Sequence, residues 1–258
     1  MAEISSKTKA AMTDSASAAV QSFSPSALQP FPSWLPALLQ ASDSFYPTGS
    51  YAHSFGLEGL VQEGVIRDQA TLREFLFCSV LPSLRQTELP LAAQAWQALG
   101  TTDWARVEAL CRLSSALRAP RELRAASENI GRQRAELAAM LHAHPLAQEY
   151  LRQAQAQSWP FSSAVSSALE GRVLGAPQVA VLSGVCYASI TALLSAAMKM
   201  LRLGQNAAQA LLTEALAAAP AIITTAVQVP FDEIGWFNPW LDIAAARHEA
   251  ADARMFIS

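Results

Sequence analysis

The chain has 258 residues, a net charge of -3 and a pI near 5.8, and 52% of its residues are hydrophobic. The slight negative charge offers no basic surface for a nucleic acid, which excludes duplex binding as the main function. The length allows one large domain or two small ones, and a composition dominated by alanine and leucine with few β-branched runs predicts an all-α fold.

Residues 1–30 are rich in serine and alanine and poor in large apolar groups, so we expect a disordered N-terminal tail. We expect residues 31–237 to form a single helical domain and residues 238–258 to be a C-terminal docking segment. Apolar periodicity, capping residues and prolines predict one helix starting near residue 88 and others at 34–40, 50–62, 71–84, 102–117, 120–141, 145–156, 162–170, 177–203, 207–218 and 239–258. Pro82 predicts a kink.

The predicted helix 50–62 contains an unusual mixture of residues. Gly56 and Gly59 each cost about 0.5 to 1 kcal/mol relative to alanine in a helix interior, so a close approach by a neighbouring helix or a partner should offset them. In a regular helix, Tyr51, Ser54 and Glu58 would share one face. That face is either a partner-binding surface or, alternatively, the place of a core tyrosine whose hydroxyl is satisfied internally.

Residues 173–198 carry no charge and are numerous enough to span a bilayer. Because small polar groups interrupt the segment, we interpret it as the central buried helix of a bundle, with a membrane span as the alternative. Lys199 and Arg202 follow it and should emerge at the rim of the bundle. They are either functional or simply cations that favour a helix C-terminus.

Residues 118–136 place Arg121, Arg124 and Glu128 on one face of a predicted helix. The face is either solvated and internally paired or a surface for an acidic partner.

The C-terminal segment also has two possible interpretations. It ends on Met255, Phe256 and Ile257, which are apolar, whereas chain ends are usually polar and frayed. We predict that this tail is mobile in the isolated protein and orders in a partner, with docking onto its own core as the alternative.

The sequence lacks the common catalytic motifs. It contains no GxxxxGK[ST] loop, GxGxxG turn, HExxH pair or GxSxG elbow. The cysteines are far apart and the histidines are scattered, so we expect no cofactor and no tight metal site within one chain. His142 and His144 are either a ligand pair or a solvated turn. The N-terminus has no continuous apolar core of a signal peptide, so we expect the cytoplasm.

Four stretches occur in order over nearly the whole chain beyond residue 33: DSFYPTGSYAHSFGLE, LRAPRELRAASENIGRQ, AAMKMLRLGQNAAQALL and DIAAARHEAADARMF. Together they resemble the UreF family of urease accessory proteins. The resemblance implies an all-helical, dimeric, cytoplasmic protein that is not itself an enzyme. It also implies a chaperone role in nickel insertion, because such proteins bridge UreD (also called UreH) and the GTPase UreG in a complex that acts on apo-urease.

The resemblance also implies which residues meet partners. The positions that match the family's motifs are Tyr51, Glu58, Arg121, Glu122, Arg124, Arg202, Gln205, Arg247, His248, Glu249 and Arg254. Position in the predicted helices adds Ser54, Lys199 and Phe256. The chain departs from the family pattern at Ser158, where many members have a histidine, and at Ile257, where many have an arginine.

These features together predict an interaction protein. We expect a homodimer that binds UreD/UreH mainly through its C-terminal region and presents a polar surface to UreG, with no nucleic acid and no membrane as partners. The alternatives are a subunit that conducts nickel directly or regulates GTP hydrolysis, with Lys199 or Arg202 near the nucleotide, and a helical membrane protein.

Overall fold

The computed structural model describes residues 31–50, 53–248 and 254–256, without the side chain of residue 248. The predicted disordered tail at 1–30 lies outside these residues. All the helices below belong to one compact unit, Trp34–Ser258.

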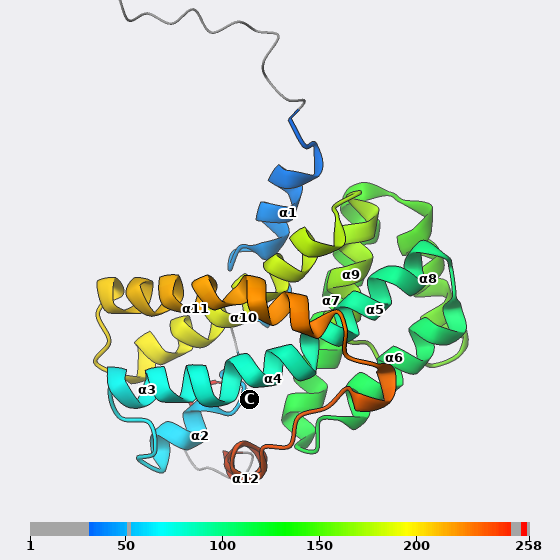
Figure 1. Cartoon of the computed structure of the whole chain (residues 1–258). Helices are drawn as coiled ribbons and strands as arrows, with labels where there is room; N and C mark the ends of the chain where they lie inside the picture. Colours follow the sequence, from blue (N-terminus) through cyan, green and yellow to red (C-terminus); the bar gives the residue numbers. More distant parts are fainter. Residues whose placement is uncertain (1–30, 51–52, 249–253, 257–258) are drawn as a thin grey trace, which may run out of the picture. The chain divides into compact units, whose positions relative to one another are not determined.

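The described residues contain helices and no strand, which confirms the all-α prediction (Figure 1). In chain order the elements are α1 (Trp34–Ser42), α2 (Leu57–Gln62), α3 (Gln69–Phe75), the π-helix η3 (Leu76–Val80), α4 (Leu81–Gln86), α5 (Glu88–Gly100), α6 (Trp104–Ala116), α7 (Arg121–His142), α8 (Pro145–Ala156), α9 (Ser163–Val173), α10 (Gln178–Met200), α11 (Gln205–Ala226), the 3-10 helix η4 (Phe231–Glu233) and α12 (Pro239–His248).

Most helix starts are set by the local signals seen in the sequence. Ser162 caps α9 by accepting a hydrogen bond from the Val165 amide, and Pro145 occupies the first turn of α8. Asp103 caps α6 by accepting a hydrogen bond from the Arg106 amide, so the helix predicted from residue 102 begins at Trp104. The helix predicted at 207–218 runs on to Ala226, and Pro220 lies inside it because buried Ile223 and Ala226 hold the last turns against the core.

The prediction for residues 50–62 is wrong at its N-terminal half. Among the described residues 53–62, the helix is confined to Leu57–Gln62, because Phe55 has a φ of 53° and Gly56 a φ of 85°, both in the left-handed region. Pro82 lies in the first turn of α4. The π-helix η3 precedes it and joins α3 to α4, which absorbs the missing amide of the proline.

The deepest helix is α9, which packs between α5 and α7 and also contacts α8 and α10. It is short and made of small residues, and Val165, Ala168 and Leu169 are fully buried. The bundle thus has the central buried helix that the sequence predicted, but α9 takes that place instead of α10. Helix α10 packs on α1, α2, α5, α9 and α11, whereas its residues Val179, Tyr187 and Met198 are exposed.

Two helices in the described part of the chain are long and apolar enough to cross a membrane, judged only by length and composition. They are α10 and α11, which pack against each other. A core helix of a soluble bundle has the same length and composition, so this observation favours neither interpretation.

Candidate functional site

The C-terminal helix α12 packs directly on α2, although the two are far apart in the sequence (Figure 1). A Cβ atom added at Gly59 would lie 2.6 Å from the carbonyl oxygen of Ala244, and one at Gly56 would lie 2.8 Å from a methyl carbon of Leu241. The two glycines therefore permit the close helix contact that the sequence predicted, and the neighbour is α12.

The carboxylate of Glu58 binds the backbone of Met255 and Phe256. It is buried at 5% exposure and accepts hydrogen bonds from the backbone amides of Met255 (2.7 Å) and Phe256 (3.0 Å). Phe256 is buried at 6% exposure, and the ammonium nitrogen of Lys199 lies 5.0 Å from the centre of its ring. We call Glu58, Lys199 and Glu122 together the tail site.

Two ion pairs fasten the C-terminal region around the tail site. Arg254 donates to Glu122 at 2.6 Å, and Arg247 on α12 donates to Glu63 after α2 at 2.8 Å. Both pairs are solvent-accessible, so they orient the segment more than they stabilise it.

His53 is buried near Glu122. Burial lowers its pKa, and the neighbouring carboxylate offsets only part of this effect.

The expectation of a free tail in the isolated protein is therefore wrong for residues 254–256. Phe256 would expose a large apolar surface if it were released, and a pocket for it exists on its own domain. The helix predicted at 239–258 does not extend to Arg254, which is not helical. Arg247 and Arg254 nevertheless both point to acidic residues next to the same site.

This chain matches a family model. The UreF model matches residues 66–216, which is more than half of the chain. The chain belongs to the UreF family. A urease accessory protein UreF from Paenarthrobacter aurescens is 31% identical over 86% of this chain and 97% of the relative. Proteins of the same name from Corynebacterium efficiens and Bacillus sp. (strain TB-90) are 29% and 27% identical over 86% of this chain, and the matches cover 96% and 98% of those proteins.

The UreF-family fold brings together only some of the residues that the sequence analysis selected. Ser54 is buried, and its hydroxyl accepts from the Glu58 amide at 3.3 Å, so it supports the start of α2. It does not share an exposed face with Glu58, because residues 53–56 are not helical. Tyr51 and Glu249, and the side chain of His248, lie outside the described residues.

The remaining predicted residues lie on other parts of the surface. Arg124 donates to the carbonyl of Arg118 at 3.0 Å and so supports the turn between α6 and α7. Arg121 is exposed at the start of α7. Arg202 is exposed in the turn between α10 and α11, and Gln205 is exposed at the start of α11.

Sequence reasoning missed an exposed aromatic surface beside α12. Phe237 and Trp240 are 84% and 77% exposed, and Trp236 and Ile243 are also exposed. We call these four residues the aromatic surface. The stretch GWFNPW places three aromatic side chains within six residues that lead into the first turn of α12. This density was the available signal, because a turn normally carries small and polar residues.

A buried ionic network was missed as well. The Tyr46 hydroxyl donates to one oxygen of Glu170, and Arg134 donates to the other at 2.5 Å. Burial and the adjacent carboxylate raise the pKa of Tyr46. The network joins the segment after α1 to α7 and α9. Next to this buried anchor, Phe45 is 93% exposed.

The described residues contain no group of three or more His, Cys, Asp or Glu side chains that could hold a metal ion. His144 uses its Nδ1 atom to accept from the Leu146 amide at 3.1 Å, so it caps α8. Burial raises the pKa of both Cys111 and Cys186 to about 12, and such thiols are poor nucleophiles and poor ligands.

Proposed function

We propose that this chain acts in urease maturation as a non-catalytic interaction subunit in the cytoplasm. In this role it bridges UreD/UreH and the GTPase UreG on apo-urease while nickel is inserted. Membership of the UreF family supports the assignment to urease maturation. The aromatic surface beside α12 is the observation that carries the proposed contact with UreD/UreH.

The aromatic surface has the properties of a binding hot spot. Tryptophan and phenylalanine side chains each bury about 150 to 250 Å² when covered, and residues of this kind dominate binding energies at interfaces. The backbone that presents them is fixed. The Asn238 side-chain amide donates to the Ser79 hydroxyl in η3, and the Gly235 amide donates to the Gln86 carbonyl at 2.9 Å. A preordered surface loses little entropy on binding.

Alanine variants of the aromatic surface test this proposal. Trp240→Ala and Phe237→Ala should each weaken copurification with UreD/UreH by about tenfold or more, with little change in melting temperature, because both side chains are exposed in the isolated chain. Phe45→Ala is the matched control, since Phe45 is equally exposed but lies near α1. Full UreD/UreH binding by Trp240→Ala would refute the proposed contact surface.

The proposed polar surface for UreG includes Tyr51. Its further proposed contacts with UreG are the exposed residues Arg121, Arg202 and Gln205. Tyr51→Ala should leave folding and UreD/UreH binding nearly intact and weaken recruitment of UreG. A melting temperature lowered by several degrees would instead identify Tyr51 as a core residue.

The regulation of GTP hydrolysis is the alternative role. Arg202→Ala should leave the GTPase rate of UreG in the assembled complex unchanged if the chain only bridges its partners.

The exposed face of α10 supports a homodimer. Val179, Ser183 and Tyr187 form an uncharged exposed stripe that a second copy of the chain would cover. Ser183→Glu places a carboxylate at its centre without removing an apolar contact. We expect this variant to be a monomer by light scattering at a concentration where the unmodified chain is a dimer. A chain that needs detergent to stay in solution would favour the membrane alternative and refute this use of the stripe.

A further inference from the structure

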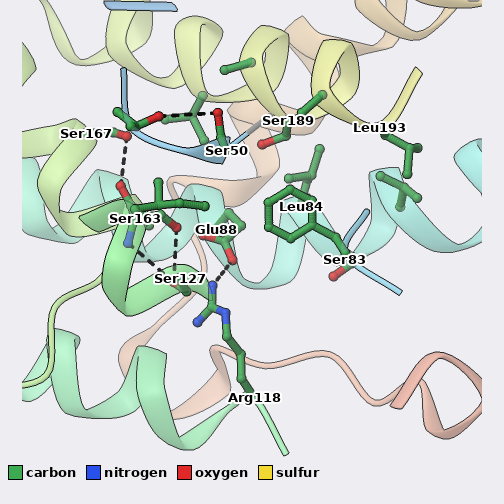
Figure 2. Close-up of a pocket in the computed structure, with 18 of the residues that line it drawn as sticks. Ser50, Ser83, Leu84, Glu88, Arg118, Ser127, Ser163, Ser167, Ser189 and Leu193 are labelled. Atoms are coloured by element: carbon green, nitrogen blue, oxygen red, sulfur yellow. Dashed lines mark hydrogen bonds and ion pairs between the residues drawn. The ribbon is translucent and has the colours of Figure 1, made fainter. Parts of the chain in front are cut away.

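A cavity of about 230 Å³ lies inside the helical unit, away from the tail site. Helices α7 and α9 form one side, α10 another, and η3 with α4 a third (Figure 2). Phe55, from the turn before α2, and Leu241, from α12, also line it. The cavity is therefore bounded by both segments that meet at the α2–α12 contact.

One end of the cavity is rich in hydroxyl groups. Figure 2 shows Ser50, Ser127, Ser163 and Ser167 near one another at this end. The Ser127 and Ser163 hydroxyl oxygens are 3.2 Å apart, and Ser167 donates to the Ser163 carbonyl at 2.8 Å. A hydroxyl group can donate one hydrogen bond and accept two, so these side chains keep capacity for a ligand.

Ser189 adds an unused hydroxyl group from α10. On the same helix, Ser183 and Thr191 each donate to the carbonyl four residues earlier at 2.8 Å. Ser189 lines the cavity and makes no hydrogen bond to any residue that the structure describes. The walls toward the other end include Leu84 and Leu193, with Ser83 and Ser189 beside them (Figure 2).

The charges beside the cavity are already neutralised. Arg118 donates to Glu88, and Arg134 is paired with Glu170. Among the described residues that line the cavity there is no histidine or cysteine, and Glu88 is the only carboxylate. A bare cation or anion would lose its hydration here without gaining a counter-charge, which favours an uncharged ligand.

We propose that this cavity is a binding site for a small uncharged amphiphile, a molecule with one hydroxyl group and an apolar body. An apolar cavity of about 150 Å³ holds benzene, so by proportion this one holds about nine non-hydrogen atoms. The hydroxyl group bonds to the serine end and the apolar body packs between Leu84 and Leu193. Because Phe55 and Leu241 complete the wall, bound ligand also stabilises the packing of α12. The proposal does not depend on the function proposed above.

The test uses the full chain and three probes of about equal size: 2-phenylethanol, ethylbenzene and phenylacetate. Calorimetry and thermal unfolding should show saturable binding and a raised melting temperature with 2-phenylethanol. Ethylbenzene should bind about tenfold more weakly, since it lacks one hydrogen bond, and phenylacetate should not bind. Equal binding of ethylbenzene, or no binding of any probe, would overturn the proposal.

Cavity-filling variants locate the site. Ala192→Leu should abolish 2-phenylethanol binding, because the added methyl groups occupy the space of the ligand. If that variant does not fold, the smaller change Ala188→Val serves in its place. Ser183→Val on the exposed face of the same helix is the matched control and should keep full binding. Binding that persists in a folded cavity-filling variant would place the probe on the surface and refute the assignment.

Discussion

The contact between α2 and α12 gives the sharpest prediction. In Gly59→Ala the new Cβ atom would lie 2.6 Å from the Ala244 carbonyl oxygen, 3.0 Å from its carbonyl carbon and 3.3 Å from its Cβ atom. The first of these atoms belongs to the backbone, so no side-chain rotation relieves the clash. Helix α12 must move by about 0.8 Å to restore an ordinary contact, which separates Leu241 and Ala245 from the residues beneath them.

Helix propensity and overpacking act in opposite directions on the stability of Gly59→Ala. Alanine is favoured over glycine in a helix by about 0.5 to 1 kcal/mol, whereas overpacking costs about 1 to 3 kcal/mol. We therefore expect Gly59→Ala to lower the free energy of unfolding by about 1 to 2 kcal/mol and to weaken UreD/UreH binding, because the aromatic surface moves with α12.

Urea unfolding and copurification with UreD/UreH measure the two effects. Gly204→Ala is the matched control, since a Cβ atom there meets nothing within 4 Å. A Gly59→Ala protein that is more stable than the unmodified chain and binds equally well would show that α12 does not pack on α2 in solution.

Three further predictions concern the buried polar groups. Glu170→Ala should lower the free energy of unfolding in urea by about 3 to 5 kcal/mol, because it leaves the buried guanidinium of Arg134 unpaired. Glu149→Ala removes a carboxylate from an exposed pair and should change this free energy little. Equal effects of the two variants would contradict the prediction. The pKa of His53 is lowered, so the unfolded chain binds the proton more readily. The free energy of unfolding should be at its full value above pH 6.5 and should decline as the pH falls below it. His53→Gln should flatten this decline. If the pH profile of the variant is unchanged, His53 is not the cause of the decline. Glu58→Ala should increase amide hydrogen exchange at Met255 and Phe256 by about tenfold or more, and preserved protection would mean that other contacts hold the tail.

The helices could be predicted closely where one local signal decides them. Pro120 and Pro145 mark the starts of α7 and α8 as expected, because a proline just before or in the first turn of a helix needs no partner for its missing amide. The start of α2 could not be predicted in this way. Gly56 looks like a costly helical residue in the sequence, and only the three-dimensional contact with Leu241 explains why a left-handed glycine is placed there.

The candidate site was predictable in its residues but not in its arrangement. Glu58, Lys199, Arg254 and Phe256 were all selected, and the structure brings them together. Their mutual contacts depend on how the last residues return across α2, and no periodicity within one segment carries that information. The ionic network around Glu170 was missed for the same reason, since its partners come from three separate segments.

The α2–α12 contact also has a consequence for biosynthesis. The residues that form α2 are made early and those that form α12 are made much later, so the body of the bundle can fold on the ribosome before α12 exists. The aromatic surface belongs to that later part of the chain. A polypeptide whose synthesis stops before residue 236 therefore carries most of the hydrophobic core but none of the aromatic surface. By this order of synthesis, the proposed docking surface is presented only by chains that have been translated past Ile243.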